Sequence, residues 1–61
     1  MPMIHVEMFE GRTPEQKRAL VSALTDAFCE TAGGTPDTVT IILTDVAKDH
    51  WAKAGKMASD G

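Results

Sequence analysis

The sequence has very little of what usually stabilises a chain this short. It contains one cysteine, Cys29, in 61 residues, so no disulfide can form within the chain. A single thiol also cannot build a zinc site of paired cysteines. Chains of about 60 residues bury only about 60% of their unfolded surface, which makes their own core marginal. Small domains without such crosslinks commonly gain stability from a partner subunit, so we expect a homo-oligomer.

Positive charge is also scarce. Six Lys and Arg face nine Asp and Glu, which gives a formal net charge of −3. Nucleic-acid binding needs a basic stripe that neutralises phosphates, and these residues form none in the sequence. No apolar run approaches the ~18 residues of a membrane span, and no basic-then-apolar leader follows Met1. We therefore expect a soluble, cytoplasmic protein that binds neither nucleic acid nor membranes.

What the sequence does contain is the pattern of a single βαβ unit. The segment Met3–Phe9 (MIHVEMF) alternates between two faces, as a strand does. Pro14–Ala32 has the 3.6-residue period of an amphipathic helix that covers a sheet. Val39–Thr44 (VTIILT) is β-branched and almost entirely apolar, as expected of a strand covered on both faces. The strands should be parallel with a right-handed crossover, which predicts an α+β fold in one domain, residues 1–61.

The ends of the predicted helix carry clear signals. Thr13 can cap the first turn, Pro14 suits the first helical position, and Gln16 completes a capping box. Gly33 and Gly34 are expected to end the helix. The residues expected on its sheet-facing side are apolar or small: Leu20, Val21, Ala23, Leu24, Ala27, Phe28 and Thr31.

The C-terminal segment is less regular. Trp51–Lys56 (WAKAGK) can form a short hairpin around Ala54 and Gly55, which would suit a contact with another subunit. A two-stranded sheet with one helix is not expected to be stable alone, so an oligomer would complete the fold.

Along essentially its whole length the sequence resembles the 4-oxalocrotonate tautomerase family. The matching features are the Met-Pro start, EGR after the first strand, EQK early in the helix, and AKDHW after the second strand. The resemblance implies a βαβ subunit with a C-terminal hairpin. It also implies subunits that pair through their sheets, with three such pairs forming a homohexamer. The implied activity is that of an isomerase that moves a proton in small 2-hydroxydienoate or enol–keto acids.

The resemblance makes Pro2 the catalytic base once Met1 has been removed. An N-terminal α-amine has a pKa of about 7.7–8.0, and a proline amine starts somewhat higher. Burial or a neighbouring cation lowers that pKa, so a neutral amine becomes available as general base. If Met1 stays, the Pro2 nitrogen is an amide without basicity. The plainer alternative is a proline that serves only to permit Met1 removal.

Arg12 and Trp51 are the substrate-binding residues that the resemblance implies. Arg12 matches a family arginine that holds a substrate carboxylate, often across a subunit boundary, and a guanidinium can do so bidentately. Trp51 stands where the family has an aromatic that lines the apolar wall near the proline. The alternatives are a solvated loop arginine and a tryptophan of the core or an interface.

Thr40 occupies the position of a second family arginine, which polarises the substrate carbonyl. Threonine can donate a hydrogen bond there but brings no positive charge. Losing one preorganised donor to a developing oxyanion costs about 2.7–4 kcal/mol. We therefore expect a weaker tautomerase or a different 2-hydroxydienoate or arylpyruvate-like enol as substrate. A lysine from a neighbouring subunit is an alternative source of the charge, and the candidates are Lys17, Lys48, Lys53 and Lys56.

Two other functions remain open from the sequence. One is dehalogenation or hydration of a small unsaturated acid on the same scaffold. The other is a non-catalytic partner in an oligomer. Neither His5 nor His50 has a carboxylate or thiol cluster at ligand spacing, so we expect no metal and no cofactor. The expected partner is a small carboxylate substrate.

Overall fold

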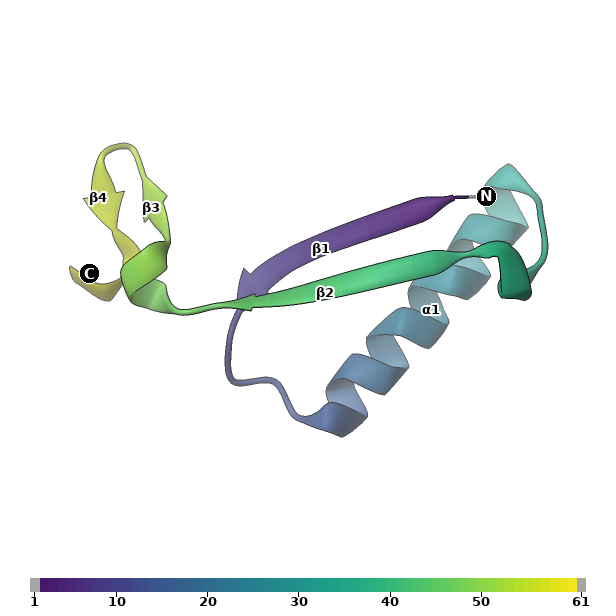
Figure 1. The fold of residues 1–61 in the computed structure, drawn as a ribbon, viewed down its shortest axis with the longest axis horizontal. Helices are drawn as coiled ribbons and strands as arrows, with labels where there is room; N and C mark the ends of the chain where they lie inside the picture. Colours follow the sequence, from purple (N-terminus) through teal and green to yellow (C-terminus); the bar gives the residue numbers. More distant parts are fainter. Residues whose placement is uncertain (1, 61) are drawn as a thin grey trace.

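The computed structural model describes residues 2–60 as a βαβ unit followed by a small hairpin (Figure 1). The main elements are β1 (Met3–Phe9), α1 (Pro14–Ala32), β2 (Thr40–Val46), β3 (Ala52–Lys53) and β4 (Lys56–Met57). Short 3-10 turns lie between or after them, namely η1 (Pro36–Thr38), η2 (Lys48–His50) and η3 (Ala58–Asp60).

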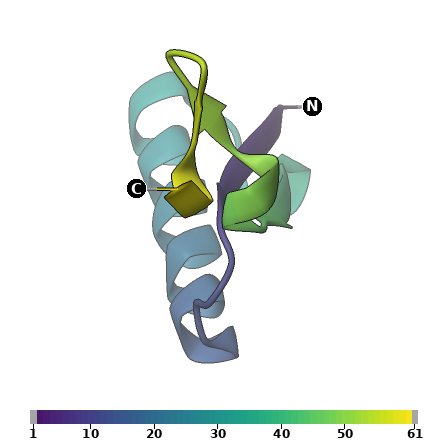
Figure 2. The ribbon, with the colours of Figure 1, turned by 90° about the vertical axis from the view of Figure 1, so that its left-hand side faces the viewer.

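β1 and β2 pair in parallel, with Met3 opposite Thr40 at one end and Phe9 opposite Val46 at the other. The helix α1 lies along one face of this sheet, as the view down the long axis shows (Figure 2). The predicted α+β fold with parallel strands is therefore confirmed. β2 begins and ends later than the predicted Val39–Thr44, because the Val39 N–H closes the η1 turn onto Pro36 while the chain pairs with β1 up to Val46.

The predicted helix ends are confirmed. The Thr13 hydroxyl accepts a hydrogen bond from the Gln16 N–H at 3.2 Å, and the Gln16 side chain accepts one from the Thr13 N–H at 2.9 Å. At the other end the Gly33 N–H donates to the Cys29 carbonyl. Gly33 and Gly34 have φ of 89° and 94°, a region that favours glycine and stops the helix.

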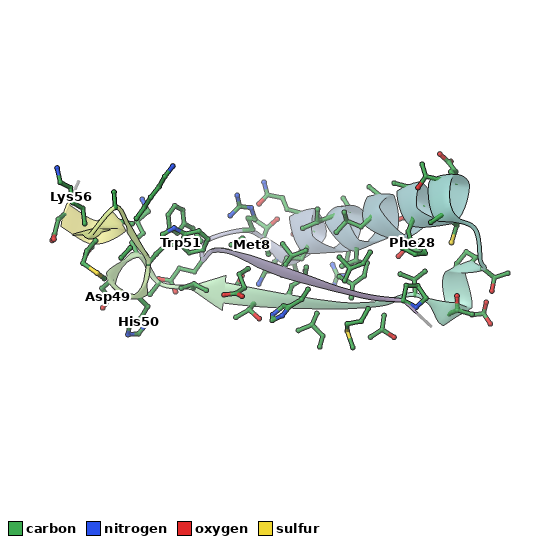
Figure 3. The ribbon with its side chains drawn as sticks, turned by 90° about the horizontal axis from the view of Figure 1, so that it is seen from above. Met8, Phe28, Asp49, His50, Trp51 and Lys56 are labelled. Carbon is green, nitrogen blue, oxygen red and sulfur yellow. The ribbon has the colours of Figure 1, made fainter. Side chains whose placement is uncertain are left out.

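The core of a single chain is a thin layer between α1 and the sheet. Ile4 and Val6 face this layer half-buried, and Met8, at 8% exposure, is the one buried hydrophobic residue among residues 2–60. Met8 and Phe28 both lie in the layer (Figure 3). The half-buried residues of α1 are Lys17, Leu20, Val21, Leu24, Thr25, Phe28 and Cys29.

The prediction assigns too many residues to the sheet-facing side of the helix. Ala23, Ala27 and Thr31 are exposed, since a sheet of two strands covers only a narrow stripe of the helix. Small side chains at these positions therefore contribute little to the core of one chain.

The outer face of the sheet is open within a single chain. Met3 is 60% exposed and Ile42 is 47% exposed, and both are large apolar residues. Farther along the sheet, the His5 Nε2 and the Thr44 hydroxyl lie 3.1 Å apart in a cross-strand hydrogen bond. Coverage of β2 on both faces, which the sequence predicts, would need something beyond this chain.

The C-terminal hairpin extends from the end of the sheet where β1 and β2 finish (Figure 1). β3 pairs with β4 in antiparallel fashion, and Ala54 and Gly55 make the turn with φ of 55° and 78°. Two consecutive residues at positive φ are typical of a tight hairpin turn. The predicted hairpin is thus confirmed. Within residues 2–60, no helix is long and apolar enough to cross a membrane.

Candidate active site

Pro2 is fixed to the start of the sheet by a backbone hydrogen bond. Its carbonyl accepts from the Thr40 N–H at 3.0 Å, so the residue continues the line of β1 beside the first residue of β2. Pro2 is half-buried and Thr40 is exposed. The structure therefore places two of the predicted site residues next to each other, at what we call the proline end.

Arg12 lies beyond the opposite end of β1. Its Nη1 donates a hydrogen bond to the Phe9 carbonyl at 2.9 Å, which holds the guanidinium against the end of the strand. Gly11, with φ of 116°, gives the chain the turn that returns Arg12 toward Phe9. The strand β1, seven residues long, lies between Pro2 and Arg12. At about 3.3 Å per residue, the separation along the strand is about 20 Å or more.

Trp51 also lies at the far end of the sheet. Its ring packs against the ring of Phe9, with centroids 4.6 Å apart and planes inclined by 56°. Figure 3 shows Trp51 where the sheet meets the hairpin. Lys48 approaches the Phe9 ring, with its Nζ 5.6 Å from the ring centroid. We refer to Phe9, Arg12, Lys48 and Trp51 as the Phe9 cluster.

Phe9 is the residue that joins this cluster, and sequence reasoning missed that role. Its only sequence signal is its position as the last residue of the alternating strand, directly before EGR. The contacts with Lys48 and Trp51 depend on how η2 folds back after β2, which the strand pattern does not predict.

The predicted site residues thus form two groups rather than one. Pro2 and Thr40 lie at the proline end, whereas Arg12 and Trp51 lie in the Phe9 cluster. The described residues of a single chain enclose no pocket. A site that uses all of these residues requires the proline end of one copy to meet the Phe9 cluster of another.

Charges near the sheet differ in how they are paired. Lys17 forms an ion pair with Asp45, and both side chains are about one-third exposed, at 32% and 37%. This pair links the first part of α1 to the inner face of β2. Lys17 is therefore held within its own chain, which weakens it as a candidate to replace the missing family arginine.

The two histidines are far from forming a metal centre. His5 is bonded to Thr44, and the His50 Nδ1 lies 4.0 Å from an oxygen of Asp49. Figure 3 shows His50 pointing away from Trp51. No group of three or more His, Cys, Asp or Glu within residues 2–60 is arranged to hold a metal ion.

Comparisons with known proteins agree with this fold. Residues 2–61 match the family model described as "Tautomerase enzyme". The chain is 47% identical over 60 residues to 2-hydroxymuconate tautomerase of Bacillus subtilis, covering 98% of this chain and 97% of that protein.

Solved structures give the same result. The crystal structure of YwhB, a homologue of 4-oxalocrotonate tautomerase, superimposes with a TM-score of 0.94 at 45% identity, covering 98% of each chain. A structure from work on 4-oxalocrotonate tautomerase isozymes of Methylibium petroleiphilum gives a TM-score of 0.89 at 36% identity, covering 95% of this chain and 94% of that one. This chain therefore belongs to the 4-oxalocrotonate tautomerase family of the tautomerase superfamily and is an isomerase of that type.

Proposed function

We propose that this isomerase moves a proton in small 2-hydroxydienoate or enol–keto acids, with the amine of Pro2 as general acid and base after Met1 is removed. The observation that carries the proposal is the hydrogen bond from the Thr40 N–H to the Pro2 carbonyl at 3.0 Å. It anchors the N-terminal residue to the sheet, so a free Pro2 amine would have a defined position. General acid–base catalysis requires such positioning of the group that transfers the proton.

The proton transfer is simple to write for a 2-hydroxydienoate. The neutral Pro2 nitrogen accepts the proton of the 2-hydroxyl group, and the electrons of that O–H bond form the carbonyl. The conjugated double bonds shift, and a carbon of the conjugated system takes a proton back from the Pro2 ammonium. The substrate exchanges an O–H bond for a C–H bond, and no redox partner is needed.

The Phe9 cluster has the chemistry to bind the rest of the substrate. The Arg12 guanidinium keeps donors beyond the one used on the Phe9 carbonyl, and these suit a carboxylate. Trp51 and Phe9 offer an apolar surface, which disfavours a protonated amine brought against it and so lowers its pKa. In this proposal the cluster of one copy faces the proline end of another.

Such a site belongs to an oligomer, and we propose a homohexamer built as a trimer of dimers. The support is the open outer sheet face with Met3 and Ile42, together with a core in which Met8 is the one buried hydrophobic residue described. Large exposed apolar residues on an unpaired sheet face mark an interaction surface. A second copy, related by two-fold symmetry, can cover this face with its own equivalent face.

The proposed substrate class is supported by the site and by one relative. A similar protein carries the name 2-hydroxymuconate tautomerase, and that compound is a dicarboxylate dienol. Arg12 can bind one carboxylate of such a molecule. Thr40 brings no positive charge to the carbonyl, so we expect lower turnover here than a site with two arginines would give.

The test is turnover of 2-hydroxymuconate, 2-hydroxypentadienoate and phenylenolpyruvate by protein whose intact mass shows loss of Met1. The rate should rise with pH through the Pro2 pKa, because the neutral amine is the base. Acylation of the Pro2 amine, or retention of Met1, should lower turnover by about 100-fold or more. Pro2→Ala is the weaker test, since it keeps a primary amine. Unchanged turnover with a blocked amine would refute the proposed mechanism.

A further inference from the structure

Two cations converge on Phe9 without an acidic partner. Arg12 contacts the backbone carbonyl of Phe9 at 2.9 Å, and the Lys48 Nζ lies 5.6 Å from the centre of its ring. Within residues 2–60, neither side chain has a carboxylate within 4.0 Å, since the ion pairs there are those of Lys17, Arg18 and His50. The chain has nine acidic residues and a net charge of −3, so partners for these cations are not scarce.

The position of Lys48 is set by the fold rather than by its flexible stem alone. Lys48 begins η2, whose backbone is closed by the hydrogen bond from the Trp51 N–H to the Lys48 carbonyl at 3.4 Å. The ring of Trp51 in turn packs on Phe9 at 4.6 Å. A cation above an aromatic face is attracted by it, which favours keeping the ammonium at the edge of the apolar surface.

We propose that Lys48 is a specificity-determining residue that makes this site prefer dicarboxylate dienols over monocarboxylate ones. This inference rests on the proposed function. Arg12 holds one carboxylate, and Lys48 gives the same end of the site a second positive charge that favours a doubly negative substrate. It compensates in binding for the positive charge that Thr40 does not provide, although it does not take over polarisation of the carbonyl.

Other cations of the chain do not suit this role. Lys17 is held by Asp45, and Arg18 lies 3.9 Å from Glu15 on the exposed helix surface. Lys53 and Lys56 face each other across the hairpin and are exposed. Among the lysines, Lys48 is the one that contacts the aromatic pair of the proposed site.

The experiment compares kcat/KM for 2-hydroxymuconate, a dicarboxylate, with that for 2-hydroxypentadienoate, a monocarboxylate. For Lys48→Met we expect the ratio of the two kcat/KM values, dicarboxylate over monocarboxylate, to fall about ten-fold. A loss of this size corresponds to the lower end of what a hydrogen bond to a charged group contributes. The loss should appear in KM more than in kcat, because the charge acts in the ground state and the transition state alike. Lys48→Arg should restore most of the ratio.

Lys53→Met is the matched control, since it removes one lysine charge from the same region without touching Phe9, and it should leave the ratio within about two-fold. In the wild type, kcat/KM for the dicarboxylate should decline more steeply with added salt than in Lys48→Met. Lys48→Gln repeats the test should the methionine variant fail to assemble. An unchanged ratio in both neutral variants, or a salt dependence for the dicarboxylate that is equal in the wild type and in Lys48→Met, would overturn the inference.

The failure of this inference is distinct from failure of the proposed function. If blocking Pro2 leaves turnover unchanged, the mechanism is wrong, and the substrate ratio still reports on Lys48. If blocking Pro2 abolishes turnover, but the ratio of kcat/KM values is the same in the wild type and the neutral Lys48 variants, the mechanism stands and the role of Lys48 is refuted.

Discussion

The proline end and the Phe9 cluster hold their residues by different means. At the proline end a backbone hydrogen bond from the Thr40 N–H to the Pro2 carbonyl fixes the position. At the other end, side chains from the strand, the loop after it and the η2 turn converge on Phe9. The first arrangement tolerates many sequences, whereas single substitutions can alter the second.

This difference suggests a division of labour within the proposed site. A group that performs the proton transfer needs a constant position, which backbone pairing provides. Substrate preference needs adjustable charge and shape, which the side chains of Phe9, Lys48 and Trp51 provide. We therefore expect substitutions in the Phe9 cluster to change which carboxylic acid is the preferred substrate. Changes at Pro2 should decide whether any substrate is turned over.

The largest effect is expected from preventing assembly, which would keep the proline end of one copy away from the Phe9 cluster of another. Ile42→Glu puts a charge into the open apolar face that we expect a second copy to cover, and burying an unpaired charge is strongly unfavourable. Sedimentation should show small or unfolded species, and activity should fall by about 100-fold or more. The matched control is Ser22→Glu, on the exposed side of α1, which should keep both assembly and activity. An intact, active hexamer of Ile42→Glu would contradict the proposed pairing through the sheets.

A mixing experiment tests whether the two ends come from different copies. Pro2→Leu, whose bulky second residue retains Met1, removes the base, and Arg12→Ala removes the carboxylate ligand. Neither variant alone should turn over 2-hydroxymuconate well. When equal amounts are unfolded and refolded together, about a quarter of the sites should combine an intact Pro2 with an intact Arg12 if the pairing is random.

The regained activity should follow from the geometry, because one chain separates Pro2 and Arg12 by the length of β1. Mixing the folded proteins without refolding is the control and should restore little. If refolded mixtures stay as inactive as the separate variants, while mass spectrometry shows mixed oligomers, the site does not combine two copies.

The sequence predicts the fold closely because each local signal agrees with the final structure. The capping box at Thr13 and Gln16, the glycines after Ala32 and the hairpin at Ala54 are all where the pattern places them. The misplaced bounds of β2 come from pairing with β1, which acts beyond the local window. Local agreement of this kind is typical of natural sequences.

The candidate site is less predictable, because it depends on contacts between distant segments. Pro2 and Thr40 become neighbours through strand register, which a parallel βαβ unit makes foreseeable. The Phe9 cluster depends on the path of η2, for which the sequence carries no periodic signal. In the proposed site, the meeting of the two ends depends on a second copy, so no single-chain pattern predicts it.

The smallest expected effect, though the most specific, is that of a positive charge placed at the proline end. Thr40→Arg should raise kcat for 2-hydroxymuconate by about ten-fold, because charge on the carbonyl oxygen grows only as the enolate forms and a nearby cation stabilises it there. KM should change less, since in the proposed site Arg12 holds a carboxylate in the ground state as well. The added cation also disfavours the Pro2 ammonium, which lowers the Pro2 pKa. The rising limb of the pH–rate profile should therefore move to lower pH.

Thr40→Met has a long side chain without charge and is the matched control for Thr40→Arg. It should show neither the gain in kcat nor the shift of the pH–rate profile. A folded, hexameric Thr40→Arg protein with unchanged or lower kcat would show that the charge at the carbonyl already comes from elsewhere, or that the site serves a different reaction.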